Sequence, residues 1–171
     1  MTAVDADGLT AVRKALARHD WQAAHDAAKT ASVGTPELEA ARADLLGEAA
    51  WWLGRLDESI EAREVAYRAY DDLGDRRQAG QCAVWLCEAN AISARPDIAG
   101  AWLRRARRAL EEDPECAEYG ALLLREAEAY CKARGAEVLT LQLPADAGED
   151  ADVFKESGYQ VAGWELERSL K

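Results

Sequence analysis

The chain has 171 residues and a formal net charge of -11, with 49% hydrophobic and 31% charged residues. Such a composition is typical of a folded chain of one domain or slightly more, not of a disordered one. The excess of negative charge disfavours nucleic acid and anionic membrane surfaces as partners, because binding to either needs a basic footprint. No basic, apolar leader is present and no apolar run approaches the ~20 residues that span a bilayer, so the sequence predicts a cytoplasmic protein.

Helical periodicity dominates the chain up to residue 134, and residues that end helices interrupt it at short intervals. Pro36, Pro96 and Pro114 stand at these interruptions, and the fourth proline, Pro144, follows the later strand. Thr35 is a good N-cap for a helix that starts at Pro36, and Gly54 is expected to end a helix in the left-handed conformation. The predicted helical segments are 8–18, 21–31, 37–73 (a hairpin that turns at Gly54), 76–93, 97–112 and 115–134.

The pattern changes after Gly135. Residues 137–143 alternate between apolar and polar, which predicts a strand, and residues 145–157 are expected to form a short helix. Residues 159–170 alternate again, and a change of phase predicts a bulge at Ala162-Gly163. The predicted organisation is a disordered N-terminus over 1–7, helical repeats over 8–134 and a βαβ-like strand–helix–strand appendage over 135–171.

The helical part is self-similar. The second helices of three predicted hairpins align on a small residue, and the turns align five residues earlier. The aligned small residues are Ala24, Ser59 and Ala99, and the turn positions are His19, Gly54 and Ala94.

The best-preserved unit resembles the tetratricopeptide repeat. Leu46 and Gly47 correspond to that repeat's Leu-Gly pair, Gly54 to its turn glycine, and Ser59 and Ala66 to its two alanine positions. The unit departs from the repeat at Ser59, where the repeat usually has alanine, and at Ala50, where it usually has an aromatic residue. Over about residues 8–134, the amino-acid sequence is similar to helical-repeat segments of bacterial, specifically actinobacterial, LuxR-type regulators. The resemblance implies a mainly α fold of antiparallel hairpins stacked as a short solenoid. It also implies protein or peptide binding on the concave face formed by the first helix of each pair.

On that resemblance, the partner-binding residues come from the first helices of the second and third hairpins. They are Ala41, Asp44, Glu48, Trp51, Trp52, Gln81, Val84 and Glu88. Consecutive helical residues are about 100° apart, so Trp51 and Trp52 cannot both enter the same core. One of them is expected to be partly exposed or on the groove, unless both pack between adjacent hairpins. A Trp-lined groove of this kind leaves a small-ligand sensor as an alternative.

The C-terminal third, residues 122–170, resembles the second half of a GNAT-type acetyltransferase. The short sequence segments 134–136, 141–144 and 158–159 stand in the order expected for that family. The resemblance implies acetyl-CoA as an alternative ligand. Of that family's glycine-rich phosphate-binding turn, only Gly120 is present in this chain. Glu115 and Glu118, close to it in the sequence, would repel phosphate. Phe154 stands where that family has a proton-donating tyrosine. We therefore expect no catalytic residues and no cofactor, with Gly120 and Phe154 the only acyl-CoA-site candidates.

The remaining chemistry-bearing residues predict no metal site and no catalytic group. The cysteines lack zinc-site spacing and are expected to be reduced, small apolar residues: Cys82, Cys87, Cys116 and Cys131. His19 is expected in a turn and His25 on a helix flank. Two strands alone are marginal in water, so a homodimer paired through the C-terminal strands is a further expectation.

Overall fold

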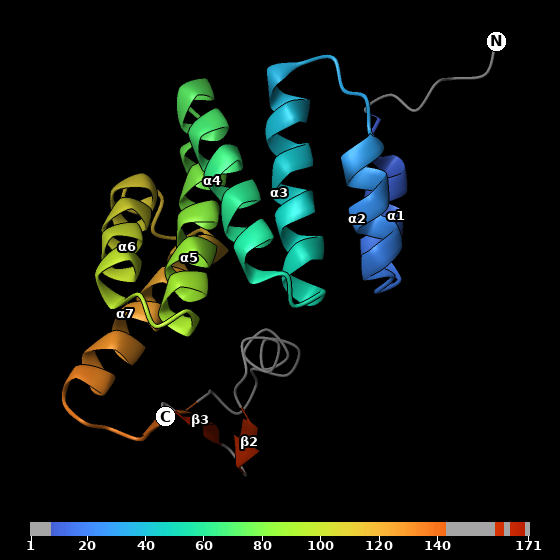
Figure 1. Cartoon of the computed structure of the whole chain (residues 1–171). Helices are drawn as coiled ribbons and strands as arrows, with labels where there is room; N and C mark the ends of the chain where they lie inside the picture. The colour runs from blue at the N-terminus through green and yellow to red at the C-terminus, as the bar shows by residue number, and fades with distance from the viewer. Residues whose placement is uncertain (1–7, 143–159, 163–164, 170–171) are drawn as a thin grey trace. The chain divides into compact units, whose positions relative to one another are not determined.

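The computed structural model of the protein describes residues 8–142, 160–162 and 165–169, with side chains described from residue 8 to residue 140. The chain forms two compact units, residues 1–122 and residues 123–171, and each is considered by itself. The described part is mainly helical, as predicted. Its helices are α1 (Thr10–Ala17), α2 (Trp21–Thr30), α3 (Pro36–Trp52), α4 (Leu56–Leu73), α5 (Arg76–Ile92), α6 (Pro96–Leu110) and α7 (Ala117–Ala133) (Figure 1).

The helices of the first unit follow one another in space as they do in the sequence, each of α1 to α5 packing on the next (Figure 1). The start of α3 shows why the boundaries were predictable. The Thr35 hydroxyl accepts a hydrogen bond from the Leu38 amide, and Pro36 begins the helix where no amide donor is needed. None of the helices in the described part is both long and apolar enough to cross a membrane.

Three hairpin turns share one backbone conformation. His19, Gly54 and Ala94, which the sequence aligned, have φ of 59°, 72° and 55°. In each turn the next residue's amide donates to the carbonyl five residues back, from Asp20 to Ala15, Arg55 to Ala50 and Arg95 to Asn90. This is the Schellman arrangement, which satisfies the last carbonyls of a helix. Two of these left-handed positions carry a side chain, which costs free energy that glycine does not.

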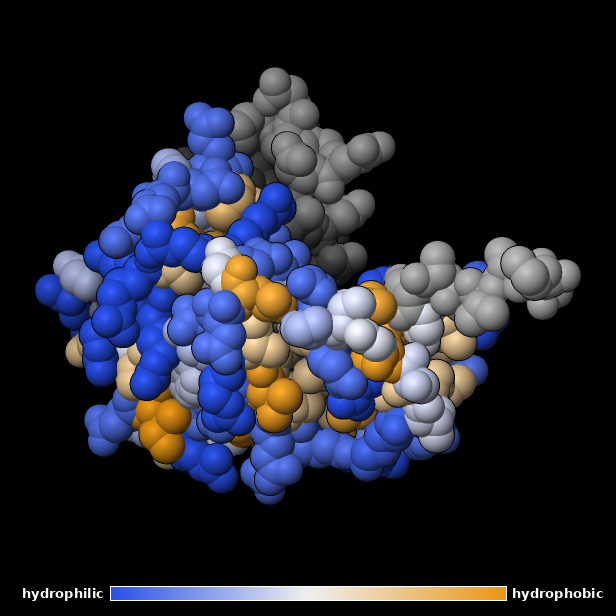
Figure 2. All heavy atoms as spheres, turned by 90° about the horizontal axis from the view of Figure 1, so that it is seen from above, coloured by the Kyte–Doolittle hydropathy of each residue, from blue (hydrophilic) through white to orange (hydrophobic). Residues whose placement is uncertain are grey.

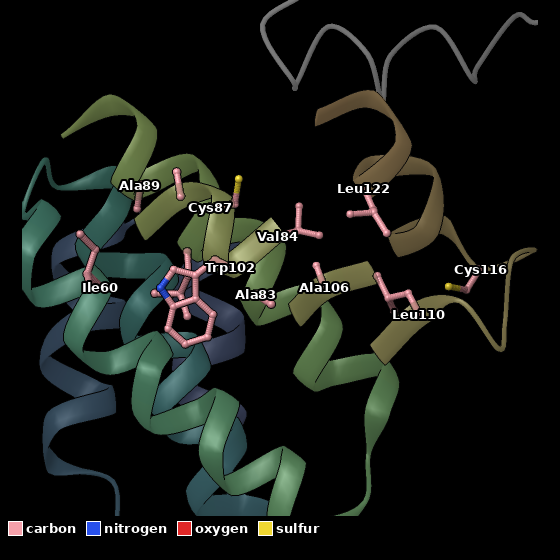
Figure 3. Close-up of a cluster of buried hydrophobic side chains, with 12 residues drawn as sticks. Ile60, Ala83, Val84, Cys87, Ala89, Trp102, Ala106, Leu110, Cys116 and Leu122 are labelled. Atoms are coloured by element: carbon pink, nitrogen blue, oxygen red, sulfur yellow. The ribbon is translucent and has the colours of Figure 1, made fainter. Parts of the chain in front are cut away.

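The largest buried cluster lies between α4, α5 and α6 and reaches the start of α7 (Figure 3). Trp102 is its largest member, 8% exposed, and its ring meets Tyr67 edge-on with centroids 5.0 Å apart. Leu110 packs so closely on α5 that a Cβ at Gly80 would lie 2.5 Å from it. The volume of this core is therefore set by a small residue on α5 facing large ones on α6.

A second close approach joins α3 to α4. The Ser59 hydroxyl donates a 2.7 Å hydrogen bond to the Gly47 carbonyl, and both residues are buried. A Cβ at Gly47 would lie 3.3 Å from the Ser59 carbonyl oxygen and 2.6 Å from Cγ of Arg63. Gly47 thus allows α3 and α4 to approach closely and also leaves room for the Arg63 side chain.

The second unit holds an antiparallel sheet in the order β1-β3-β2, formed by β1 (Val138–Gln142), β2 (Gln160–Ala162) and β3 (Glu165–Ser169). Leu141 pairs with Leu166 across β1 and β3. The predicted first strand is confirmed. It pairs antiparallel with β3, and because β2 is also antiparallel to β3, β1 and β2 run in the same direction with β3 between them. The predicted helix at 145–157 lies outside the described residues.

The expected single strand over 159–170 is wrong. It is two strands, β2 and β3, that pair antiparallel, with Ala162 opposite Glu165. The chain therefore reverses direction between these two strands, and the predicted bulge involves Gly163, which lies outside the described residues. A reversal after very few residues and an inserted residue shift the apolar alternation in the same way, so the sequence pattern alone does not separate them.

Figure 2 shows one face of the molecule, on which hydrophilic residues predominate and hydrophobic ones form small, separate areas. On that face no broad apolar surface is presented.

Candidate functional site

The candidate site lies where side chains of α3 and α5 meet above α4. We call it the α3–α5 face and define it by Asp44, Glu48 and Trp51 of α3, Trp85 of α5 and Arg63 of α4. The rings of Trp51 and Trp85 meet edge-on, with centroids 5.4 Å apart and planes at 67°. Asp44, Glu48 and Trp51 lie on one side of α3 because they are four and three residues apart. Both tryptophans are half-buried.

A buried arginine lies at the base of this face. Arg63 is 3% exposed, and its guanidinium carbon lies 4.5 Å from the centroid of the Trp85 ring. Its Nη1 is 3.5 Å from Oδ1 of Asp44, which is a long ion pair. Its Nε is buried and has no hydrogen-bond partner. A buried guanidinium with an unmet donor is costly, so the surroundings hold it in place through Asp44, the Trp85 ring and the space beside Gly47.

Asp44 joins three helices. Besides facing Arg63 of α4, its Oδ1 accepts a 3.6 Å hydrogen bond from the Cys82 thiol of α5. Burial, and the nearby charge of Asp44, raise the pKa of the Cys82 thiol, so this sulfur stays protonated and remains a donor. Asp44 is therefore occupied within the protein by a cation and by a thiol.

Glu48 differs from Asp44, one helical turn away. Among the described residues, none forms a hydrogen bond or ion pair with its carboxylate, although the side chain is half-buried. Burial raises the pKa of Glu48, Asp44 raises it further, and only the charge of Arg63 opposes the shift. The face thus keeps one carboxylate in partly desolvated surroundings without a partner.

The structure brings only part of the predicted groove together. Asp44, Glu48 and Trp51 lie on the α3–α5 face. Ala41 instead packs against the buried cluster of α1 and α2, and Val84 is 8% exposed in the cluster of Figure 3. Gln81 and Glu88 are half-buried on α5.

Trp52 points to a different neighbour from Trp51. It is 50% exposed and stacks on Trp21 of α2, with centroids 5.3 Å apart and planes at 19°. Trp21 in turn stacks on His19, 4.9 Å away. The prediction that the two adjacent tryptophans take different directions is confirmed, since Trp51 turns toward α5 and Trp52 toward α2.

Sequence reasoning missed Arg63 and Trp85. Each had a usable signal. Arg63 stands four residues after Ser59, in the same register as Leu103 after Ala99, so a charged residue occupies a place that a neighbouring hairpin gives to an apolar one. Trp85 directly follows Val84, which was predicted for the groove.

The expectation that His25 lies on a helix flank is wrong, because it is 2% exposed. Its Nε2 is 3.0 Å from Oε2 of Glu58 and its Nδ1 is 3.3 Å from Oδ1 of Asp26. Hydrogen bonds from Lys29 and from His25 lower the pKa of Glu58 to about 2. This network joins α2 to α4, and its partners are too far apart in sequence for spacing to reveal them.

The two acyl-CoA candidates are Gly120 and Phe154. Gly120 is exposed on α7, and Phe154 lies outside the described residues. Burial works against ionisation of Glu118, yet the hydrogen bond from Arg77 lowers its pKa overall, which keeps a negative charge in the first turn of α7. Such a charge disfavours phosphate there. Within the described part, no group of three or more His, Cys, Asp or Glu residues is arranged to hold a metal ion.

Comparisons with family models, with curated proteins and with solved structures give no match to this chain. The function is therefore inferred from the residues of the α3–α5 face and from the helices that position them.

Proposed function

We propose that this chain is a non-catalytic, tetratricopeptide-like helical-repeat module that binds a protein or peptide at the α3–α5 face, in a regulatory or assembly role. The shared Schellman turns at His19, Gly54 and Ala94 support the repeat interpretation. In such an array each hairpin exposes the side of its first helix, so α3 and α5 supply neighbouring rows of side chains to one surface.

One observation carries the proposal, namely the meeting of Trp51 and Trp85 beside the unpaired carboxylate of Glu48. Aromatic rings with accessible edges and a few polar groups are the composition of protein-recognition surfaces. A purely structural contact between α3 and α5 would be more stable with apolar residues than with a half-buried unpaired carboxylate.

The test is selection of 12-residue peptides from a random displayed library on the immobilised full chain. Selected peptides are then measured against Gln81→Arg, which crowds the face from α5, and against Val65→Arg, which adds the same side chain at an exposed position of α4. We expect a set of peptides whose Kd rises about tenfold or more in Gln81→Arg and is unchanged in Val65→Arg.

Trp51→Leu provides a second variant, with thermal unfolding used to confirm that it is folded. Loss of the same peptides in this variant would support the assignment. If every selected peptide binds both arginine variants equally well, the α3–α5 face is not the binding surface and the proposal fails.

A further inference from the structure

The charges of the α3–α5 face are divided between one internal pair and one group without a partner. Arg63 is the cation at its base, and Asp44 is the acceptor that faces Arg63 and the Cys82 thiol. Asp44 is therefore already engaged. Glu48 is not, because no described residue donates to its carboxylate. The group left for a partner is a carboxylate.

The aromatic side chains beside Glu48 add a second recognition element. Glu48 and Trp51 are three residues apart on α3 and so are neighbours on its surface. The face already contains one guanidinium resting on a tryptophan, since Arg63 lies 4.5 Å from the centre of the Trp85 ring. A carboxylate next to an indole is the combination that attracts an ammonium or guanidinium group, by ion pairing on one side and by the ring's negative face on the other.

Arg63 supplies an independent sign that the network is incomplete. It is 3% exposed, and its Nε–H has no acceptor even though Glu48, a possible acceptor, is on the neighbouring helix beside Gly47. In native protein structures, almost all buried hydrogen-bond donors have an acceptor. Because Arg63 is buried at the base of the face, the charged group that a partner can reach is the half-buried Glu48 carboxylate. A peptide offers a cationic side chain to such a carboxylate.

We propose that the partner segment is basic and that one of its lysine or arginine side chains docks between the Glu48 carboxylate and the Trp51 ring. This inference rests on the proposed function, since it names the chemistry of the segment bound at that face. The net charge of -11 acts in the same direction, because it attracts a basic partner at long range and repels an acidic one.

The test uses the peptides selected on the full chain and asks for their composition and their dependence on Glu48. We expect those lost in Gln81→Arg to be enriched in lysine or arginine at one position relative to the starting library. In Glu48→Gln their Kd should rise about tenfold, and in wild type it should rise with salt. Glu61→Gln, on the exposed side of α4, is the matched control and should leave the Kd unchanged.

The outcomes separate the two proposals. Face-dependent peptides that are acidic or neutral, or that bind Glu48→Gln unchanged, would overturn the basic-partner inference and leave the binding face intact. Absence of any face-dependent peptide would overturn the proposed function itself. A direct NMR titration of Glu48 gives an independent readout: a pKa above the ordinary glutamate value supports the open carboxylate. A pKa below it would mean that Glu48 has closed onto Arg63 and is not available to a partner.

Discussion

Single side chains in this protein show how strongly burial decides chemical behaviour. Arg63 and His25 are ionisable residues that are almost wholly buried, and both are held by partners on other helices. Glu58, by contrast, keeps contact with solvent, and hydrogen bonds from Lys29 and His25 lower its pKa to about 2. Of these three groups, Glu58 links the stability of the fold to pH.

Glu58 makes the first unit sensitive to acid. Its folded pKa is depressed from 4.5 to about 2, so its stabilising contribution is present above pH 4.5 and is lost as the pH falls toward 2. Because the side chain is 28% exposed, we expect Glu58→Gln to cost only about 1 kcal/mol at pH 7. Urea unfolding between pH 7 and pH 2 should show the two proteins converging at the acid end, with Glu61→Gln following wild type. Curves that stay parallel over this range would contradict the assignment.

The four cysteines should differ in reactivity. Cys82, Cys87 and Cys116 are buried and Cys131 is half-buried, and burial raises the pKa of the Cys82 thiol. We therefore expect one thiol to react quickly with a disulfide reagent at pH 8 and the other three only after unfolding. Cys131→Ser should abolish the fast phase. If Cys82→Ser abolishes it instead, the burial described for α5 does not hold in solution.

At the scale of elements, the turns decide where the helices end. His19, Gly54 and Ala94 adopt the same left-handed conformation, and only one of them is the residue type that does so without strain. The turns therefore carry a small, uneven cost. Substitutions at Gly54 and Ala94 form a matched pair that measures this cost without a change in packing. A Cβ at Gly54 would meet nothing within 4 Å, and Ala94 is exposed.

Exchanging the two residues should shift stability in opposite directions. Ala94→Gly is expected to stabilise the chain by about 0.5–1 kcal/mol, since relief of left-handed strain exceeds the entropy that glycine adds to the unfolded chain. Gly54→Ala should destabilise it by a similar amount. Both are measured by urea unfolding at pH 7. Equal signs for the two variants would show that something other than backbone conformation controls these turns.

Most of the helical layout could be predicted because local signals agree with each other. Pro36, Pro96 and Gly54 interrupt the apolar periodicity where helices of the structure begin or end. The helix-breaking residues and the periodicity therefore predict the same boundaries. The site was harder to predict. Glu48 and Trp51 follow from their spacing on one helix, whereas the Arg63–Trp85 contact and the burial of His25 depend on residues from other helices, and single-sequence periodicity contains no information about which helix lies opposite.

At the scale of the whole molecule, the described strands of the second unit form a sheet in which each of the two outer strands pairs on one side only. β3 is central, and β1 and β2 flank it. Val138, at the start of β1, is 52% exposed. An apolar residue on an outer strand favours pairing with a second copy, and natural edge strands often carry lysine to prevent it.

We therefore expect a concentration-dependent homodimer through the C-terminal strands, seen by light scattering coupled to gel filtration at micromolar concentrations. Val138→Lys should shift the population toward monomer without changing the helical circular dichroism signal. Lys132→Ala, on the exposed side of α7, is a control that should leave the dimer unchanged. A wild-type chain that stays strictly monomeric across this range would rule out strand pairing.

The stacked rings of His19, Trp21 and Trp52 have an optical consequence. Two indoles 5.3 Å apart and nearly parallel couple their electronic transitions, so together they produce a paired band in circular dichroism that isolated tryptophans lack. The two indoles come from different helices, α2 and α3, and so the band persists only while these helices remain docked. The molecule thus contains a built-in spectroscopic reporter for the separation of its N-terminal helices from the rest of the array.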